Sequence, residues 1–183
     1  MTTVRPNEKS PAVFLDRDGT IMEDVGYCGR PEQVKIFAGA ADALQRLRKH
    51  GFKLFIITNQ SAVGRGYFTE AQYRVVEAEF LRQVGARLID GTYFCPDKPD
   101  TSSRRRKPAP EMVFEAQREH NLDLSRSFFI GDKDIDIECG RSAGVRTILV
   151  QTGYGKDTAD CGADWIARDL TQATEIILNN ANE

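Results

Sequence analysis

Five short apolar runs constrain the fold of this 183-residue chain more than any other feature. They are rich in β-branched and aromatic residues and lack the polar alternation of a half-exposed strand. Strands that are covered on both faces, as in parallel sheets, show this pattern. We therefore predict buried strands at 12–15, 53–58, 91–95, 127–131 and 145–150.

The segments between these runs carry helix signals. Apolar residues recur at helical spacing over 40–47, and Gly51 follows as a stop. Thr69 and Gln72 form a capping-box pattern at the start of a helix that we expect to end near residue 85. Further helices are predicted from Pro110 to about 121, over 133–143, and from Asp169 onward.

This alternation of strands and helices predicts an α/β fold. The expected architecture is a Rossmann-like three-layer sandwich with a mainly parallel sheet between two layers of helices. The length fits one domain at about 150 residues per domain. We expect a flexible N-terminal tail at 1–10 and a single domain over 11–183.

Charge and composition exclude several classes of protein. Lys and Arg number 25 against 27 Asp and Glu, and the net charge of -2 argues against a general nucleic-acid or membrane-surface binder. The four cysteines contain no CxxC pair, and no apolar run approaches the roughly 20 residues that span a bilayer. The polar N-terminus also lacks the apolar core of a signal peptide. We expect a cytoplasmic monomer without nucleic-acid or membrane partners.

Polar side chains stand where the predicted strands end. Asp16 and Asp18 follow the first strand, Thr58 ends the second, and Asp132 follows the fourth. Lys107 precedes the helix that leads into the fourth strand. Each residue alone is more often a turn or cap residue. Because the carboxyl ends of parallel strands meet at one edge of a sheet, the set in this order predicts a functional site there.

These motifs resemble the haloacid dehalogenase-like phosphohydrolase superfamily over about residues 12–155. They read FLDRDGT, IITNQS, RKPAPEM and GDKDID. The segments FLDRDGTI, TNQS followed by GRG, FTEAQ, YFCP and RKPAPEM are similar to the histidinol-phosphatase and heptose-bisphosphate phosphatase group. The resemblance implies Mg²⁺-dependent hydrolysis of the C7 phosphate of a heptose 1,7-bisphosphate through an aspartyl-phosphate. That reaction serves the synthesis of nucleotide-activated heptose and lipopolysaccharide precursors.

The chemistry explains the residue types in these motifs. A carboxylate nucleophile divides a very slow hydrolysis into two easier steps, and we assign this role to Asp16. Asp18 would be the general acid and base. Thr58 and Lys107 would stabilise the transferring phosphoryl group. The resemblance implies a Mg²⁺ site made by the side chains of Asp16 and Asp132 and the backbone carbonyl of Asp18, supported by Asp136 one helical turn later.

Substrate recognition is expected to come from loops, because the short segments after the first and second motifs leave no room for a separate cap domain. Arg106 aligns with a substrate-recognition arginine of the group that the chain resembles, and the arginine fork suits bidentate phosphate binding. Arg104 and Arg105 fit a solvated charge run equally well. Arg17 is expected to lie outside the chemistry, because its neighbours' side chains must face the site. The implied substrate-binding residues are Asp24, Gly26, Tyr27, Asn59, Gln60, Ser61, Arg65, Arg106 and Lys133.

The loop at 95–106 departs from the group it resembles. Many members carry a CxH…CxC zinc site there. This chain has Cys95, but Asp97, Ser103 and Arg105 stand at the other three positions. A structural zinc takes four ligands, usually Cys and His, so we predict Mg²⁺ as the cofactor and no zinc.

Three alternatives stay open at this point. The substrate could be histidinol phosphate, or the protein could be a polynucleotide 3′-phosphatase, although the acidic charge balance disfavours a nucleic-acid substrate. A phosphosugar-binding protein without turnover is the non-enzyme alternative. The presence of both Asp16 and Asp18 disfavours it.

Overall fold

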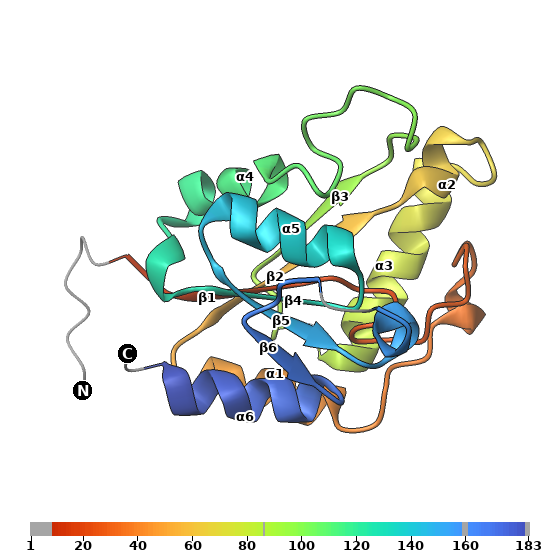
Figure 1. Cartoon of the computed structure of the whole chain (residues 1–183). Helices are drawn as coiled ribbons and strands as arrows, with labels where there is room; N and C mark the ends of the chain where they lie inside the picture. Colours follow the sequence, from red (N-terminus) through yellow and green to blue (C-terminus); the bar gives the residue numbers. More distant parts are fainter. Residues whose placement is uncertain (1–8, 86, 159–160, 182–183) are drawn as a thin grey trace.

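A six-stranded sheet forms the centre of the computed structural model, which describes residues 9–85, 87–158 and 161–181 (Figure 1). All strands are parallel and lie in the order β3–β2–β1–β4–β5–β6. The five predicted strands and the α/β fold class are confirmed. The strands are β1 (Ala12–Leu15), β2 (Lys53–Asn59), β3 (Gly91–Cys95), β4 (Phe128–Gly131), β5 (Arg146–Val150) and β6 (Trp165–Ala167).

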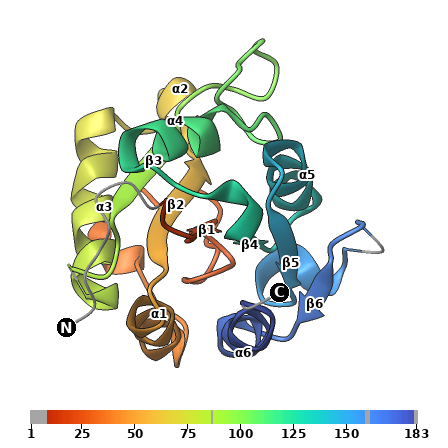
Figure 2. The same ribbon diagram turned by 90° about the vertical axis from the view of Figure 1, so that its left-hand side faces the viewer.

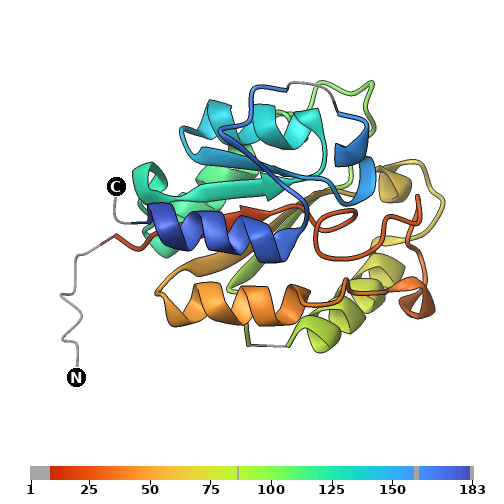
Figure 3. The ribbon, with the colours of Figure 1, turned by 60° about the horizontal axis from the view of Figure 1, so that its bottom comes forward.

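Helices cover both faces of the sheet and complete the predicted three layers (Figure 2). On one face lie α1 (Ala40–Lys49), α3 (Glu70–Val84) and α6 (Leu170–Asn180). Figure 3 brings this face forward, with α6 beside α1. On the other face lie α4 (Glu111–His120) and α5 (Asp134–Ala143). The shorter elements are α2 (Ser61–Gly64) and the 3₁₀ turns η1 (Pro31–Gln33), η2 (Leu124–Arg126) and η3 (Gly153–Lys156).

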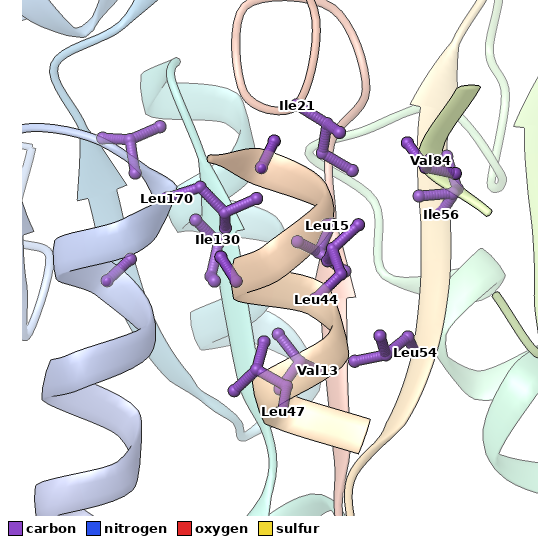
Figure 4. Packing of buried hydrophobic residues seen from close by; sticks show 14 of the residues in the cluster. Val13, Leu15, Ile21, Leu44, Leu47, Leu54, Ile56, Val84, Ile130 and Leu170 are labelled. Atoms are coloured by element: carbon purple, nitrogen blue, oxygen red, sulfur yellow. The ribbon is translucent and has the colours of Figure 1, made fainter. Parts of the chain in front are cut away.

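Strand alternation divides the core into two apolar clusters. Val13 and Leu15 point to one face, where they pack with Leu44 and Leu47 of α1 (Figure 4). Phe14 points to the other face and packs beside Phe55 and Phe129. Both sides of β1 are therefore fully buried, as the lack of polar alternation in its sequence indicates.

The helix boundaries follow the predicted capping signals. Thr69 Oγ1 accepts the Gln72 backbone N–H at 3.2 Å, and Gln72 Oε1 accepts the Thr69 N–H at 2.8 Å. Asp169 caps α6 in a related way, by accepting the Gln172 N–H at 2.9 Å. Gly144 ends α5 with a φ of 76°, a backbone conformation that favours glycine.

Apart from the 3₁₀ turns, two elements were not predicted from the sequence. The strand β6 has only three residues at the sheet edge, and Ile166 is 55% exposed, so its sequence lacks a buried apolar run. The helix α2 is a single turn after β2. Of the expected tail, residues 1–8 lie outside the described part of the chain, whereas the Ser10 N–H donates to the Asn121 carbonyl at 3.2 Å.

The direction in which successive strands are added to the sheet reverses at β1, and such a reversal forms a crevice. From β1 the chain first adds β2 and β3 on one side, and then β4, β5 and β6 on the other. Ligands in such sheets bind beyond the carboxyl ends of the strands at this reversal. Among the described residues, none of the helices combines the length and the apolar character that a membrane crossing requires.

Candidate active site

Three carboxylates meet beyond the ends of β1 and β4. One oxygen from each of Asp16, Asp132 and Asp136 lies within 4.8 Å of the others, and all three residues are buried. Asp136 comes from the first turn of α5, where its Oδ2 accepts the Lys133 N–H at 3.1 Å. Gly19 has a φ of 85°, and a Cβ there would lie 2.3 Å from Asp132 Oδ2, so the close packing of the first motif on Asp132 requires glycine.

The electrostatics of this cluster fit a divalent cation. Burial raises the pKa of Asp132, and the nearby carboxylates of Asp16 and Asp136 raise it further. Burial also raises the pKa of Asp136, against the opposing effect of Lys107. Asp132 Oδ1 has no hydrogen-bond partner among the described residues. A buried set of carboxylate oxygens with an unpartnered atom is the donor set that a hard cation such as Mg²⁺ prefers.

Lys107 is the positive charge inside this cluster. Its Nζ donates to Asp16 Oδ1 and to the Ile57 carbonyl, both at 2.7 Å. It also lies 2.7 Å from Asp136 Oδ1, as an ion pair without hydrogen-bond geometry. Burial lowers the pKa of Lys107, but Asp136 and Asp16 outweigh burial and hold the pKa above its ordinary value. The ammonium group is therefore charged at neutral pH.

Asn59 holds the backbone that carries Lys107. Its Nδ2 donates to the Lys107 carbonyl at 3.1 Å, and its Oδ1 accepts the Lys107 N–H at 3.0 Å. These two bonds tie the end of β2 to a segment 48 residues later in the chain. Asn59 thus orients the lysine in addition to lining the pocket described below.

Asp18 and Thr58 are linked through one amide. Gln60 Nε2 donates to Asp18 Oδ2 at 3.0 Å and to Thr58 Oγ1 at 2.9 Å. Burial raises the pKa of Asp18, whereas Arg17 lowers it and Asp16 raises it. Arg17 was expected to lie outside the chemistry, but its side chain reaches the site, where its Nε and NH2 atoms donate to Asp18 at 3.0 and 3.1 Å.

A pocket of about 340 Å³ adjoins the buried carboxylates through Asp18. It brings together every predicted substrate-binding residue except Arg65, which is exposed at the end of α2. The lining residues are Asp18, Asp24, Gly26, Tyr27, Asn59, Gln60, Ser61, Ala62, Arg106, Lys133, Ile135 and Tyr154.

Lys133 joins two sides of this pocket. Its Nζ donates to Asp24 Oδ2 at 3.1 Å and lies 4.7 Å from the centroid of the Tyr154 ring. Burial lowers the pKa of Lys133, but Asp16, Asp132 and Asp24 raise it overall, so the ammonium stays protonated. The loop that carries Asp24 is shaped by the Gly26 N–H, which donates to Asp24 Oδ1 at 2.8 Å.

The segment after β5 was not predicted to belong to the site. The Tyr154 N–H donates to Asp132 Oδ2 at 2.9 Å, and Thr152 Oγ1 donates to the Gly19 carbonyl at 2.6 Å. Gly153 has a φ of 54°, and a Cβ there would lie 2.3 Å from Asp132 Oδ2. The available signal is the GYG sequence at 153–155, which follows a buried strand at the same sheet edge after Gln151 and Thr152.

The loop at 95–106 is held by hydrogen bonds between its own side chains. Cys95 Sγ lies 3.4 Å from Asp97 Oδ2 and 3.6 Å from Ser103 Oγ. Arg105 donates to both Glu115 carboxylate oxygens at 2.8 and 2.9 Å, which favours a structural role over a substrate contact. One thiol, one carboxylate and one hydroxyl do not fit the Cys and His donor set of a structural zinc.

Comparisons with known proteins agree with this geometry. Residues 104–173 match the HAD-hydrolase-like family. The D-glycero-beta-D-manno-heptose-1,7-bisphosphate 7-phosphatase of Yersinia pestis is 36% identical over 178 residues, which cover 91% of this chain and 95% of that protein. The corresponding protein of Helicobacter pylori is 39% identical over 145 residues, or 77% and 83% of the two chains.

Solved structures show the same fold. The D,D-heptose 1,7-bisphosphate phosphatase of B. bronchiseptica, complexed with magnesium and phosphate, superposes with a TM-score of 0.86 at 29% identity. The match covers 93% of this chain and 99% of that chain. The enzyme of the same name from Burkholderia thailandensis gives 0.68 at 26% identity, over 92% and 98% of the chains. With three strand-end motifs and the Lys107 motif in place at the reversal of a parallel sheet, the chain belongs to the haloacid dehalogenase-like hydrolase family.

Proposed function

We propose that the protein is a Mg²⁺-dependent phosphatase that removes the C7 phosphate of D-glycero-D-manno-heptose 1,7-bisphosphate. The observation that best supports this proposal is that cationic groups lie at two depths in the site, one among the buried carboxylates and the others in the pocket wall. Lys107 is buried beside Asp16, whereas Arg106 and Lys133 line the pocket. A substrate with a phosphate at each end matches this separation, and the similar proteins named above act on such a substrate.

In the first step, an oxygen of Asp16 attacks phosphorus and forms an aspartyl-phosphate while the bond from phosphorus to the C7 oxygen breaks. Protonated Asp18 gives its proton to the departing C7 oxygen. The Lys107 ammonium balances the negative charge of the transferring group, and the Thr58 hydroxyl donates to one of its oxygens.

In the second step, Asp18 works in the opposite direction. It takes a proton from a water molecule that attacks phosphorus, which releases inorganic phosphate and restores the Asp16 carboxylate. Between β1 and α1 the described residues form only loops and the η1 turn, so water can reach this step from the open pocket. This openness favours a phosphatase over a mutase, which must shield its phosphoenzyme from water.

Asp16, Asp132 and the Asp18 carbonyl would hold the magnesium ion, with Asp136 beside them. When bound, the ion supplies positive charge to the phosphate oxygens during transfer. We also propose that residues 11–183 work as one domain, because β1 and β6, which lie near its two ends, belong to one sheet.

The direct test is a comparison of phosphate release from three substrates: heptose 1,7-bisphosphate, histidinol phosphate and 3′-phosphorylated DNA. We expect the highest kcat/KM for the bisphosphate. Faster turnover of histidinol phosphate or of the DNA end would replace the substrate assignment. Absence of turnover on all three would favour a sugar-phosphate binding protein.

Removal of divalent metal should abolish activity without unfolding the protein. A chelator should reduce phosphate release to background, and Mg²⁺ should restore it. Because Mg²⁺ at 100 times its Kd stabilises the folded state by about 2.7 kcal/mol, the unfolding temperature should rise on its addition. Full activity in metal-free buffer would contradict the magnesium assignment.

The same samples test the zinc prediction. The Cys95 loop is held by Asp97 and Ser103, so elemental analysis should find no stoichiometric zinc. A chelator should leave the unfolding temperature of the protein without added Mg²⁺ unchanged. Zinc at one atom per chain would show that this loop is a metal site.

Replacement of Arg106 by Ala should reduce selectivity for the bisphosphate. Arg106 NH1 donates to the Asp97 carbonyl at 2.9 Å, which fixes the side chain at the pocket wall, and we expect the guanidinium to hold the phosphate that is not hydrolysed. Loss of one partner of a desolvated charge pair costs about 2–5 kcal/mol, which corresponds to about a 30-fold or larger fall in kcat/KM.

A heptose 7-monophosphate never makes this contact, so its kcat/KM should change little in Arg106→Ala. Exposed Arg104 provides the matched control, and Arg104→Ala should preserve both rates. An equal loss on both substrates would assign Arg106 to the reacting phosphate or to the loop. No loss on either substrate would show that the second phosphate is held by another residue.

A further inference from the structure

Arg17 is a buried arginine whose guanidinium is directed at Asp18. Only 1% of the residue is exposed. Its Nε donates to Asp18 Oδ2 at 3.0 Å, and its NH2 donates to Asp18 Oδ1 at 3.1 Å. The guanidinium also lies 5.6 Å from the ring centroid of Tyr73 in α3, which is itself buried. Through its two hydrogen bonds to Asp18, the guanidinium binds both carboxylate oxygens in a bidentate contact.

The free-energy cost of burying a guanidinium indicates that Arg17 does more than fill space in the core. Removing a guanidinium from water is costly, and an apolar side chain of similar size would fill the same space at less cost. Asp18 is the one carboxylate among the described residues to which Arg17 forms a salt bridge, and the Arg17 NH1 atom has no partner among them. The burial is compensated mainly at Asp18, so the position favours a role in holding Asp18.

The two hydrogen bonds from Arg17 determine how the Asp18 carboxylate is oriented. Gln60 Nε2 is a third donor to the Asp18 carboxylate, so this group at the wall of the pocket has two donors at Oδ2 and one at Oδ1. Each carboxylate oxygen has a second lone pair. Oδ2 uses both of its lone pairs on Arg17 and Gln60, whereas Oδ1 accepts from Arg17 alone and keeps one lone pair for the proton that goes to the oxygen leaving phosphorus.

We propose that Arg17 is a positioning residue that orients Asp18 for proton transfer to the leaving oxygen. This inference rests on the phosphatase function proposed above. It assigns Arg17 no contact with substrate and explains why an arginine stands between the two aspartates of the first motif.

The test compares a substrate with a poor leaving group, the heptose bisphosphate, with p-nitrophenyl phosphate, whose leaving group needs little protonation. General acid catalysis contributes about 10²–10⁴-fold, so Arg17→Met should lose about 10- to 100-fold in kcat on the sugar phosphate. The loss on the aryl phosphate should be about threefold or less. Arg17→Lys, which retains the charge but lacks the fork, should fall between Arg17→Met and the wild type on the sugar phosphate.

A double-variant cycle separates orientation of Asp18 from general structural damage. In an Asp18→Asn background, Arg17→Met should cause little further loss on the sugar phosphate, because the amide that replaces the carboxyl group cannot transfer a proton to the leaving oxygen. Arg74 lies over the same Tyr73 ring at 5.7 Å from its centroid, and its guanidinium donates to Glu70 and Glu77. Arg74→Met is therefore the matched packing control and should leave the ratio of the two rates unchanged.

Several outcomes would overturn the inference. Equal losses on both substrates in Arg17→Met, or a full additional loss in the Asp18→Asn background, would make Arg17 merely structural. If Arg17→Met fails to fold, the two rates of Arg17→Lys decide in the same way. If the wild-type protein hydrolyses both substrates and the ratio is unchanged in the variants, the Arg17 inference alone fails. If it hydrolyses neither substrate, the proposed function fails as well.

Discussion

Asp16→Asn is expected to reduce phosphate release by about 10⁴-fold or more, because a neutral amide cannot replace the attacking carboxylate. Asp16 stands beyond the end of β1, and its Oδ1 accepts from Lys107 Nζ at 2.7 Å. The measurement is release of inorganic phosphate, together with chemical trapping of the aspartyl-phosphate, which should disappear. Turnover near the wild-type rate would exclude Asp16 as the nucleophile.

The fold of this variant should survive, which separates a chemical defect from a structural one. Asp16 is one of three buried carboxylates within 4.8 Å of one another, so neutralising it relieves repulsion. In metal-free buffer we expect an unfolding temperature at or above that of the wild type. Asp134→Asn is the matched control, because Asp134 belongs to the fourth motif but is exposed, and its activity should be unchanged.

Lys107→Met is expected to lose both activity and stability. Lys107 is 3% exposed and neutralises Asp16 and Asp136, so its removal leaves buried carboxylates without their cation. Breaking a buried ion pair in this way costs about 3–5 kcal/mol, which lowers the unfolding temperature of a domain of this size by about 6–20 °C. Thermal unfolding in metal-free buffer measures the effect.

Two further variants test whether the lower unfolding temperature is specific to the loss of the Lys107 charge. Lys133→Met removes a lysine that is one-third exposed and paired with Asp24, so its unfolding temperature should fall much less. In the double variant Lys107→Met, Asp136→Asn, one uncompensated charge is also removed, and part of the lost stability should return while activity stays absent. An unchanged unfolding temperature in Lys107→Met would mean that these carboxylates are not held by the lysine.

Buried strands and capped helices were accessible from the sequence because their signals are local. The run KLFIIT and the Thr69–Gln72 pair each carry their information within a few residues, and both are observed as β2 and the start of α3. The strand β6 escaped prediction for the same reason. With three residues and an exposed Ile166 at the sheet edge, it exists through its pairing with β5 rather than through an apolar run.

The convergence of Asp16, Thr58, Lys107 and Asp132 was also predictable. In the structure Lys107 bonds to Asp16, Asp132 lies in the same carboxylate cluster, and Gln60 links Thr58 to Asp18. Asp16, Thr58 and Asp132 could be placed together because they follow strands and parallel strands share a carboxyl edge, whereas Lys107 precedes a helix and was placed there by the order of the motifs. The hydrogen-bond and ion-pair partners of the individual side chains could not be predicted in this way. Arg65, predicted to bind substrate, is exposed at the end of α2 and is not among the residues that line the pocket.

Side-chain partners were decided by the tertiary structure. Period-two alternation predicts that Arg17 points away from its neighbours, but β1 ends at Leu15 and the chain turns, so the arginine folds back onto Asp18. The Tyr154 N–H reaches Asp132 because β5 lies next to β4, although 22 residues separate the two in sequence. The sequence by itself determined the elements, the family motifs and the sheet edge where they meet. Which donor satisfies which buried carboxylate depended on distances between segments far apart in the chain, and no local pattern encodes those distances.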